Sequence, residues 1–368
     1  MGAVVTELGE IDSPALIVDL GVMEANLASI AWLVASRGID LWPNIKGHKI
    51  PALAWRQVRA GAAGITCQKL AEAEVMVNAG FTDILVAVQV VGAAKVERLR
   101  RLAHRAHVMT VVDSLAGATA ISEAFDRHGG TIDALLEVDV GYRRCGVGAG
   151  DVVELARKIS PLPGLRIVGV MAYEGHIYDL SRRDEVLAAA RTSYETLLGA
   201  ASRLRAAGID VRRVSVGASA GVEVAVETPG ITDIRAGSYL MNDRAQMAMG
   251  AAVEERCAAT VLATVVSVPN RDRAVIDAGA KALTPTTIEG VDGYGLVAGG
   301  DGLVVGRLSD EHGMIDIERA TRPFRVGDRV RIIPNSHTVV FNQFAEVYGV
   351  RDGRIEAVLP VAARGMMQ

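Results

Sequence analysis

The chain has 368 residues, half of them hydrophobic, and a formal net charge of −4. This length accommodates two domains or one large barrel with a smaller unit, and the weak negative charge argues against a nucleic-acid partner or a membrane surface. No apolar run reaches the roughly 18 residues that cross a bilayer, and the acidic N-terminal stretch lacks the features of a signal peptide. Three cysteines without CxxC spacing are typical of a reducing compartment, so we expect a cytoplasmic protein.

The first expected element is a strand within residues 13–20, "SPALIVDL". From about residue 38 to 245, short runs rich in β-branched residues alternate with amphipathic stretches rich in Ala, Leu and Arg. "GIDLWPNI" is the first of eight such runs and "ITDIRAGSY" is the last. Alternation of strand and helix predicts a parallel sheet, and eight strands favour a TIM-type (β/α)8 barrel over a doubly wound open sheet.

The pattern changes after about residue 250. Segments such as "FRVGDRVRIIPN" and "DGRIEAVLPVAARG" alternate apolar and polar residues and turn on Gly, Asp-Gly or Pro-Asn. They predict an antiparallel β-domain at residues 249–368, which follows a barrel at residues 21–248. We expect the strand within residues 1–20 to join that β-domain.

Several of the predicted barrel strands end in polar residues, where a barrel places its chemistry. Lys46 follows the first strand, Gln68 the second, Arg144 the fifth, and Tyr173 and His176 the sixth. The seventh and eighth strands lead into the small-residue loops "VGASAG" and "AGSYLMND", whose backbone N–H groups could bind a phosphate. Each residue alone is more often structural or a solvated charge. Their convergence on one face predicts a site in which a lysine forms a Schiff base.

These motifs resemble those of the fold-type III pyridoxal-phosphate enzymes, and within them the D-threonine aldolase and D-serine dehydratase group, which has an alanine racemase-like fold. The resemblance runs nearly end to end and rests on "PNIK", "EVDVGYRRCGV", "VMAYEGH", "VSVGASAG" and "RVRIIPN". It implies that Lys46 forms the internal aldimine and that Arg144 contacts the phenolic oxygen of the cofactor. It also implies a homodimer, in which the β-domain of one chain covers the barrel mouth of the other.

The resemblance assigns two sets of site residues. The expected cofactor-binding residues are Lys46, Gln68, Arg144, Tyr173, Ser219, Ala220, Gly237, Ser238 and Tyr239. The expected catalytic residues are Lys46, Tyr173, His176 and His337.

The sequence departs from the family pattern most clearly at the site of a divalent metal. Relatives bind the metal through His-x-Cys or His-x-Asp just after Pro-Asn, but Ser336 and Thr338 occupy those positions here. Neutral hydroxyls are poor ligands for zinc or manganese, so metal binding is doubtful and we assign no metal ligand. His337 lies one position out of register. On a strand it would point to the opposite face, unless a bulge brought it back.

The resulting prediction is a lyase that cleaves a D-configured β-hydroxy-α-amino acid by a retro-aldol reaction through the Lys46 aldimine. A small-molecule amino acid would be its substrate. The alternative is a metal-independent amino acid racemase or epimerase, because such a reaction needs no Lewis acid. The interpretation as a dehydratase is weakened most by loss of the metal, because a dehydratase must expel hydroxide. A non-catalytic cofactor carrier is disfavoured by the β-domain, which such carriers lack.

Overall fold

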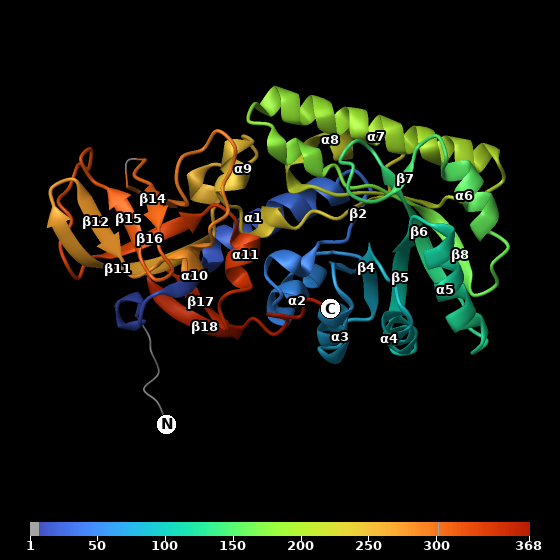
Figure 1. Ribbon diagram of the computed structural model, residues 1–368, viewed down its shortest axis with the longest axis horizontal. Coiled ribbons are helices and arrows are strands. Elements are labelled where there is room, and N and C mark those ends of the chain that lie inside the picture. The colour runs from blue at the N-terminus through green and yellow to red at the C-terminus, as the bar shows by residue number, and fades with distance from the viewer. Residues whose placement is uncertain (1–6, 301) are drawn as a thin grey trace.

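The computed structural model describes residues 7–300 and 302–368 and forms two units side by side (Figure 1). The first six residues of the predicted N-terminal segment lie outside the described residues. One unit contains eight parallel strands in the order β2-β10-β9-β8-β6-β5-β4-β3. Their bounds are β2 Asp40–Leu41, β3 Ile65–Cys67, β4 Asp83–Gln89, β5 His107–Val112, β6 Ile132–Asp139, β8 Leu165–Met171, β9 Arg213–Val216 and β10 Asp233–Ile234.

Backbone hydrogen bonds between the first and last strands of this order close the sheet. The N–H of Ala63 donates to the carbonyl of Leu41 at 2.9 Å, and the N–H of Thr66 donates to that of Pro43 at 2.9 Å. Asn44 and Thr66 continue the parallel pairing. The sheet is therefore a barrel of eight strands, which confirms the predicted fold class.

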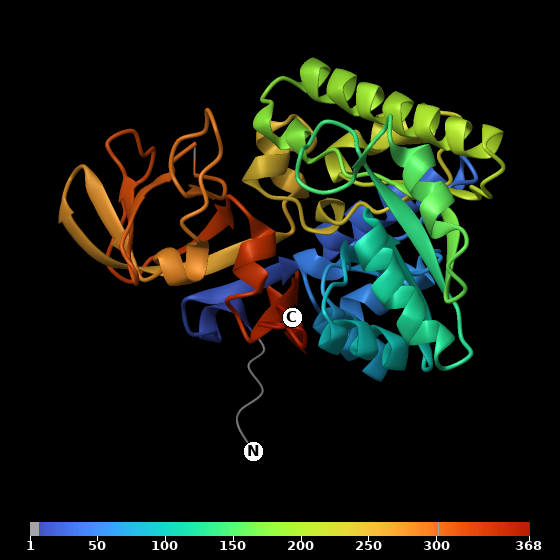
Figure 2. The same ribbon diagram turned by 45° about the vertical axis from the view of Figure 1, so that its right-hand side comes forward.

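Helices follow the strands and cover the outside of the barrel (Figures 1 and 2). Side chains alternate along each strand: Ile84 and Val86 join the main core beneath the helices, whereas Leu85 and Ala87 join a smaller cluster inside the barrel. Trp42 belongs to the inner cluster. The helices are α1 Leu20–Ala35, α2 Pro51–Arg59, α3 Leu70–Asn78, α4 Ala93–Ala103, α5 Leu115–Asp126, α6 Val152–Ile159, α7 Arg183–Ala206 and α8 Val222–Glu227.

The second unit is a mainly antiparallel sheet in the order β14-β15-β12-β11-β1-β17-β18, with β16 and β13 branching from β11. Strand β1 is antiparallel to β11 and parallel to β17, so the N-terminal strand lies in the middle of the sheet (Figure 2). The bounds are β1 Ala15–Asp19, β11 Ala259–Asn270, β12 Arg273–Ile276, β13 Gly295–Val297, β14 Val305–Leu308, β15 Gly313–Asp316, β16 Arg329–Pro334, β17 Glu346–Arg351 and β18 Arg354–Pro360.

Short elements connect or extend these two units. Strand β7 (Val147–Gly148) pairs with β6, and the short helices are α9 Arg244–Ala248, α10 Ala280–Leu283 and α11 His337–Phe341. The segment after β16 is thus a helix, so the strand expected around His337 is wrong. Among the described residues, no helix is both long and apolar enough to cross a membrane.

Candidate active site

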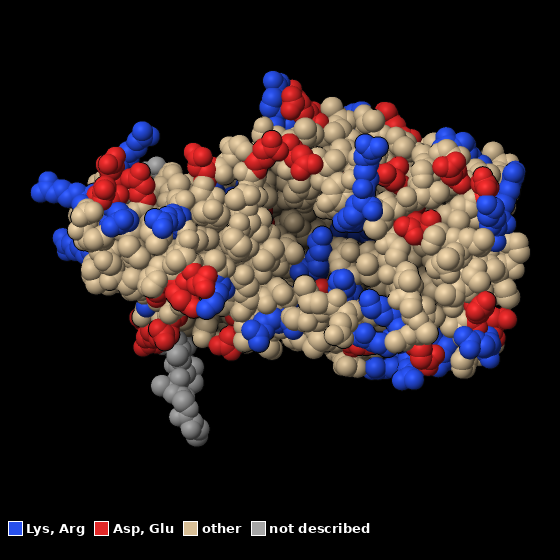
Figure 3. Space-filling view, in the orientation of Figure 1, with Lys and Arg blue, Asp and Glu red and all other residues tan. Residues whose placement is uncertain are grey.

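A cavity of about 410 Å³ lies where the C-terminal ends of the barrel strands face the second unit. Figure 3 shows this hollow near the centre of the molecule, with Lys and Arg side chains beside it. The barrel contributes cationic, aromatic and small residues to the wall, and the second unit contributes mainly hydroxyl and amide side chains. The principal lining residues are Lys46, Gln68, Arg144, Tyr173, Ser219, Arg235, Gly237, Ser238, Asp243, Thr286, Asn335, Ser336 and Thr338.

Most of the residues that the sequence singled out line this cavity. Lys46, Gln68, Arg144, Tyr173, Ser219, Gly237 and Ser238 all do so. The other four contact it only through neighbours or not at all. Tyr239 donates its backbone N–H to Ser219 Oγ, and Ala220 is buried within the turn Ser219–Gly221. His176 and His337 are not among the lining residues.

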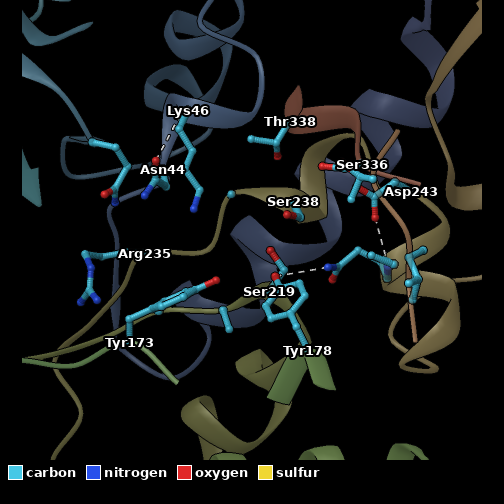
Figure 4. A pocket seen from close by; sticks show the side chains of 18 of the residues that line it. Asn44, Lys46, Tyr173, Tyr178, Ser219, Arg235, Ser238, Asp243, Ser336 and Thr338 are labelled. Carbon is cyan, nitrogen blue, oxygen red and sulfur yellow. Dashed lines mark hydrogen bonds between the residues drawn. The ribbon is translucent and has the colours of Figure 1, made fainter. Parts of the chain in front are cut away.

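Lys46 lies in the 3₁₀ turn Ile45–Gly47 that follows β2. The side chain of Asn44 accepts a hydrogen bond from the Lys46 N–H at 3.1 Å and so holds the turn (Figure 4). Burial chiefly, and the charges of Arg144 and Arg235, lower the pKa of the Lys46 amine against an opposing effect of Glu72. A lysine that loses its proton more readily is a better nucleophile toward an aldehyde.

Two side chains from neighbouring strand ends surround the lysine. Its Nζ lies 5.5 Å from the centroid of the Tyr173 ring, and the Arg144 guanidinium lies 5.0 Å from the same ring. Burial raises the pKa of the Tyr173 hydroxyl well above its usual value, so this hydroxyl keeps its proton and can donate it in a hydrogen bond. Arg144 also approaches the Glu137 carboxylate at 3.9 Å.

The small-residue loops after β9 and β10 form a tight cradle. Ser219 Oγ accepts a hydrogen bond from the Tyr239 N–H at 3.0 Å, which ties the two loops together. A Cβ on Gly217 would lie 2.6 Å from the Tyr173 ring, and one on Gly237 would lie 2.6 Å from the Asn44 carbonyl oxygen. Only glycine fits at either position. Hydroxyls and free backbone N–H groups at such a cradle suit a phosphate.

A buried carboxyl group supports the cradle from behind. Glu174 accepts hydrogen bonds from the Tyr194 hydroxyl at 2.7 Å and from the Gly217 N–H at 3.3 Å. Burial raises the pKa of Glu174, against the smaller effect of these hydrogen bonds. The arrangement fixes the loop before any ligand arrives.

His176 is placed away from the cavity. It lies in the 3₁₀ helix Gly175–Asp179, its ring packs near Gly141, and its Nε2 lies 3.4 Å from Ser193 Oγ. His176 is not among the residues that line the cavity, and its catalytic role stays a prediction.

The sequence analysis missed Arg235 and Asp243, which both line the cavity. Arg235 is 4% exposed and donates hydrogen bonds to Ser215 Oγ and to the carbonyl of Ala172. A charged residue inside the apolar run "ITDIRAG" is the signal that could have found it. Asp243 caps helix α9, and nothing in its sequence context distinguishes it from an ordinary N-cap.

The comparisons with known proteins point to one family over nearly the whole chain. Residues 18–245 match the family described as "Alanine racemase, N-terminal domain", and residues 258–350 match "Putative serine dehydratase domain". The chain is 34% identical to a D-threonine aldolase from an Arthrobacter species, covering 97% of this chain and 94% of the relative. It is 32% identical to a D-threo-3-hydroxyaspartate dehydratase from Delftia sp. (strain HT23), covering 91% and 93%. The crystal structure of a D-threonine aldolase from Filomicrobium marinum matches with a TM-score of 0.93 at 33% identity, covering both chains fully.

The chain belongs to the D-threonine aldolase and D-serine dehydratase family. This membership confirms the predicted family and, with it, pyridoxal phosphate as the cofactor. The cavity fits that group. The cradle of Ser219, Ser238 and glycines suits the phosphate, Lys46 supplies a primary amine to the cavity that suits the aldehyde, and Arg144 and Arg235 are cations that suit polar atoms of the ring.

The residues at the metal position of the family do not fit a divalent ion. Ser336 and Thr338 offer neutral hydroxyls. The nearby carboxylate of Asp243 already accepts hydrogen bonds from the Gln246 N–H and from both the backbone N–H and Nδ1 of His337. Within the described residues, no group of three or more His, Cys, Asp and Glu side chains is arranged to hold a metal.

Proposed function

We propose that the protein is a pyridoxal-phosphate-dependent lyase that cleaves a D-configured β-hydroxy-α-amino acid into glycine and an aldehyde. The observation that carries this proposal is the cavity itself, where the amine of Lys46 lies beside Tyr173 and the second unit adds the hydroxyls of Thr286, Ser336 and Thr338. The curated relatives over nearly the same length include an aldolase and a dehydratase of such substrates, which supports a lyase over a racemase.

The chain's own residues can perform three tasks. The cradle of Ser219 and Ser238 anchors the phosphate, and Lys46 presents an amine with a lowered pKa. When bound, the cofactor accepts the electron pair of a bond broken at Cα. Tyr173 keeps its hydroxyl proton and can orient a carboxylate or hydroxyl by a hydrogen bond. The hydroxyls of Thr286, Ser336 and Thr338 can contact a substrate bound in the same cavity.

Product analysis tests the proposal. The loaded enzyme is incubated with D-threonine and L-threonine, D-serine and a D-phenylserine in deuterated buffer, and products are followed by proton NMR. We expect glycine and an aldehyde from the D isomers. A 2-oxo acid with ammonia would instead indicate a dehydratase, and appearance of the opposite isomer without glycine would indicate a racemase or epimerase.

Matched lysine variants connect this activity to the cavity. Lys46→Ala should abolish both cleavage and the visible absorbance of bound cofactor. Lys158→Ala is the control, because Lys158 pairs with Glu154 on the exposed face of α6. A Lys46→Ala enzyme that still cleaves the substrate at the wild-type rate would refute the assignment.

We further infer a homodimer located in the cytoplasm. The family resemblance supports the dimer, because the cavity lies between the two units and a second chain could complete its mouth. Three free cysteines, of which Cys145 is exposed, support a reducing compartment. Light scattering of the purified protein tests the dimer, and a fluorescent fusion followed by fractionation tests the location.

A further inference from the structure

Asp243, His337 and Thr338 form a hydrogen-bonded chain that ends at the cavity. Asp243 Oδ2 accepts a hydrogen bond from His337 Nδ1 at 2.6 Å, and His337 Nε2 lies 3.5 Å from Thr338 Oγ1. His337 is 1% exposed and Asp243 is 4% exposed, whereas Thr338 lines the cavity on the same side as Lys46 (Figure 4). A ligand in the cavity can therefore exchange a proton with His337 through the hydroxyl of Thr338.

The carboxylate of Asp243 determines which ring nitrogen of His337 carries the proton. Because Nδ1 donates to Asp243, Nε2 of the neutral ring retains a lone pair and can accept a proton from Thr338. The backbone N–H of His337 also donates to Asp243 Oδ2 at 3.0 Å. These two contacts fix the orientation of the ring. The Phe341 ring packs edge-on against it, with 6.2 Å between centroids.

The end of this chain lies next to the turn that carries Lys46. A Cβ built on Gly47 would lie 2.9 Å from His337 Nε2 and 3.7 Å from Thr338 Oγ1. The residue after Lys46 must therefore be a glycine for the imidazole to approach. This contact places Thr338 beside the turn that carries Lys46, and both side chains line the same cavity.

We propose that Thr338 is a catalytic residue, which takes the proton of the substrate β-hydroxyl and passes its own proton to His337, so that cleavage proceeds without a metal ion. His337 and Asp243 are positioning residues that act through Thr338. This inference rests on the proposed function and explains how the reaction proceeds where relatives have metal ligands. A carboxylate that faces a protonated imidazole stabilises the charge that develops there.

The atoms of the proposed step balance. The O–H bond of the β-hydroxyl breaks, its proton moves to Thr338 Oγ1, and the proton of Thr338 moves to His337 Nε2. The freed oxygen pair forms the C=O bond of an aldehyde as the Cα–Cβ bond breaks. The electron pair of that bond stays with Cα, which then gains one proton to give glycine. His337 afterwards returns its proton to solvent.

The experiment uses the loaded full-length enzyme and separates two reactions at the same site. Cleavage of a D-β-hydroxy-amino acid needs a base for the hydroxyl, whereas exchange of the α-proton of glycine with deuterated buffer does not. We expect Thr338→Val to lower kcat for cleavage by about 100-fold or more, the usual contribution of general-base catalysis. Glycine exchange, KM and cofactor absorbance should stay within about threefold of wild type.

Companion variants make the result specific. Thr338→Ser retains the hydroxyl and should restore most of the cleavage rate. His337→Gln, which cannot accept the proton, should show the same selective loss as Thr338→Val. Thr196→Val is the matched control, because Thr196 Oγ1 donates only to the Thr192 carbonyl on the exposed face of α7. Treatment with EDTA should leave wild-type cleavage unchanged, with or without added Mn²⁺.

Each contrary outcome overturns the proposal in a distinguishable way. Equal losses of cleavage and glycine exchange in Thr338→Val would show a structural effect. Cleavage at the wild-type rate by Thr338→Val, or by His337→Gln, would refute the proposed proton relay. Loss of cleavage with EDTA and its recovery with Mn²⁺ would show that the reaction uses a metal ion. Failure of the wild-type enzyme to cleave any tested substrate would instead refute the proposed function, and the relay with it.

Discussion

Replacement of Lys49 by methionine should destabilise the protein by leaving a carboxylate buried without its partner. Lys49 Nζ lies 3.3 Å from Glu72 Oε1, and these two side chains are 6% and 2% exposed. The N–H of Gln68 also donates to Glu72 at 2.9 Å. This contact would remain in Lys49→Met, but it carries no full charge to balance that of the carboxylate.

The magnitude follows from the distance and the burial. Two unit charges 3.3 Å apart interact by about 5 kcal/mol at an effective dielectric constant of 20. Removal of one partner of a buried pair costs about 3 to 5 kcal/mol in unfolding free energy. Because the Gln68 N–H remains, we expect a loss near the lower end, about 3 kcal/mol. An exposed pair is worth at most about 1 kcal/mol.

Urea denaturation followed by tryptophan fluorescence measures the loss. Arg98→Met is the matched control, because Arg98 pairs with Glu74 at 2.8 Å where both side chains are about one-third exposed. The double variant Lys49→Met/Glu72→Leu should recover most of the stability, since it leaves no charge unpaired. The reasoning fails if Lys49→Met costs no more than Arg98→Met, or if the double variant is no more stable than Lys49→Met.

The same variant should also change the pKa of Lys46, the lysine that we propose binds the cofactor. Burial and Arg144 lower the pKa of Lys46, whereas Glu72 opposes them. Without Lys49, the uncompensated charge of Glu72 acts more strongly, so the pKa of Lys46 should rise. The rate at which the apoenzyme takes up pyridoxal phosphate should then increase only at higher pH than in wild type. An unchanged pH profile would contradict this.

Three further predictions concern residues around the cavity. Complete burial lowers the pKa of His48 from 6.5 to about 4, so the stability that depends on its neutral form is present above pH 6.5. About 2 kcal/mol of it should be lost by pH 5, and His48→Gln should reduce this pH dependence. Tyr194→Phe removes a donor from the buried Glu174 carboxyl group and should cost about 1 to 3 kcal/mol in a urea titration. Gly237→Ala would place a Cβ 2.6 Å from the Asn44 carbonyl oxygen, and should weaken cofactor binding about tenfold, as measured by titration of absorbance.

Each of the three has its own control. If His48→Gln retains the wild-type slope of unfolding free energy against pH, another group causes the acid sensitivity. Tyr348→Phe, at an exposed pair with Glu346, should change stability by no more than about 0.5 kcal/mol, and an equal effect of Tyr194→Phe would contradict its role. A Cβ at Gly150 meets nothing within 4 Å, so Gly150→Ala should bind cofactor normally. If Gly237→Ala also binds normally, the loop can move.

The barrel and the lysine were predictable because their patterns are local. An apolar run followed at once by a lysine indicates a strand end in a barrel, and Lys46 does line the cavity. The position of His176 was not predictable in this way. Its distance along the chain from Tyr173 is short, but it lies in the 3₁₀ helix Gly175–Asp179, and only Tyr173 of the two is among the residues that line the cavity.

The contacts between the two units could not be predicted from the sequence, for a different reason. The expectation for His337 assumed a continuous strand, whereas helix α11 begins at this residue. The partner that orients it, Asp243, is 94 positions earlier in the chain. No periodicity in a single sequence relates two residues so far apart. Arg235 was missed because its charge lies inside an apolar run, where we expected only core residues.

The central position of β1 has a consequence for the order of events during synthesis. Strand β1 is made first, yet its neighbours β11 and β17 lie roughly 250 and 330 positions later in the chain. The barrel can therefore assemble on the ribosome while β1 still has both edges unpaired. Unpaired edges invite association with other chains. Slow translation just after residue 248 would prolong this exposure, so the nascent chain should depend most on chaperones at that stage.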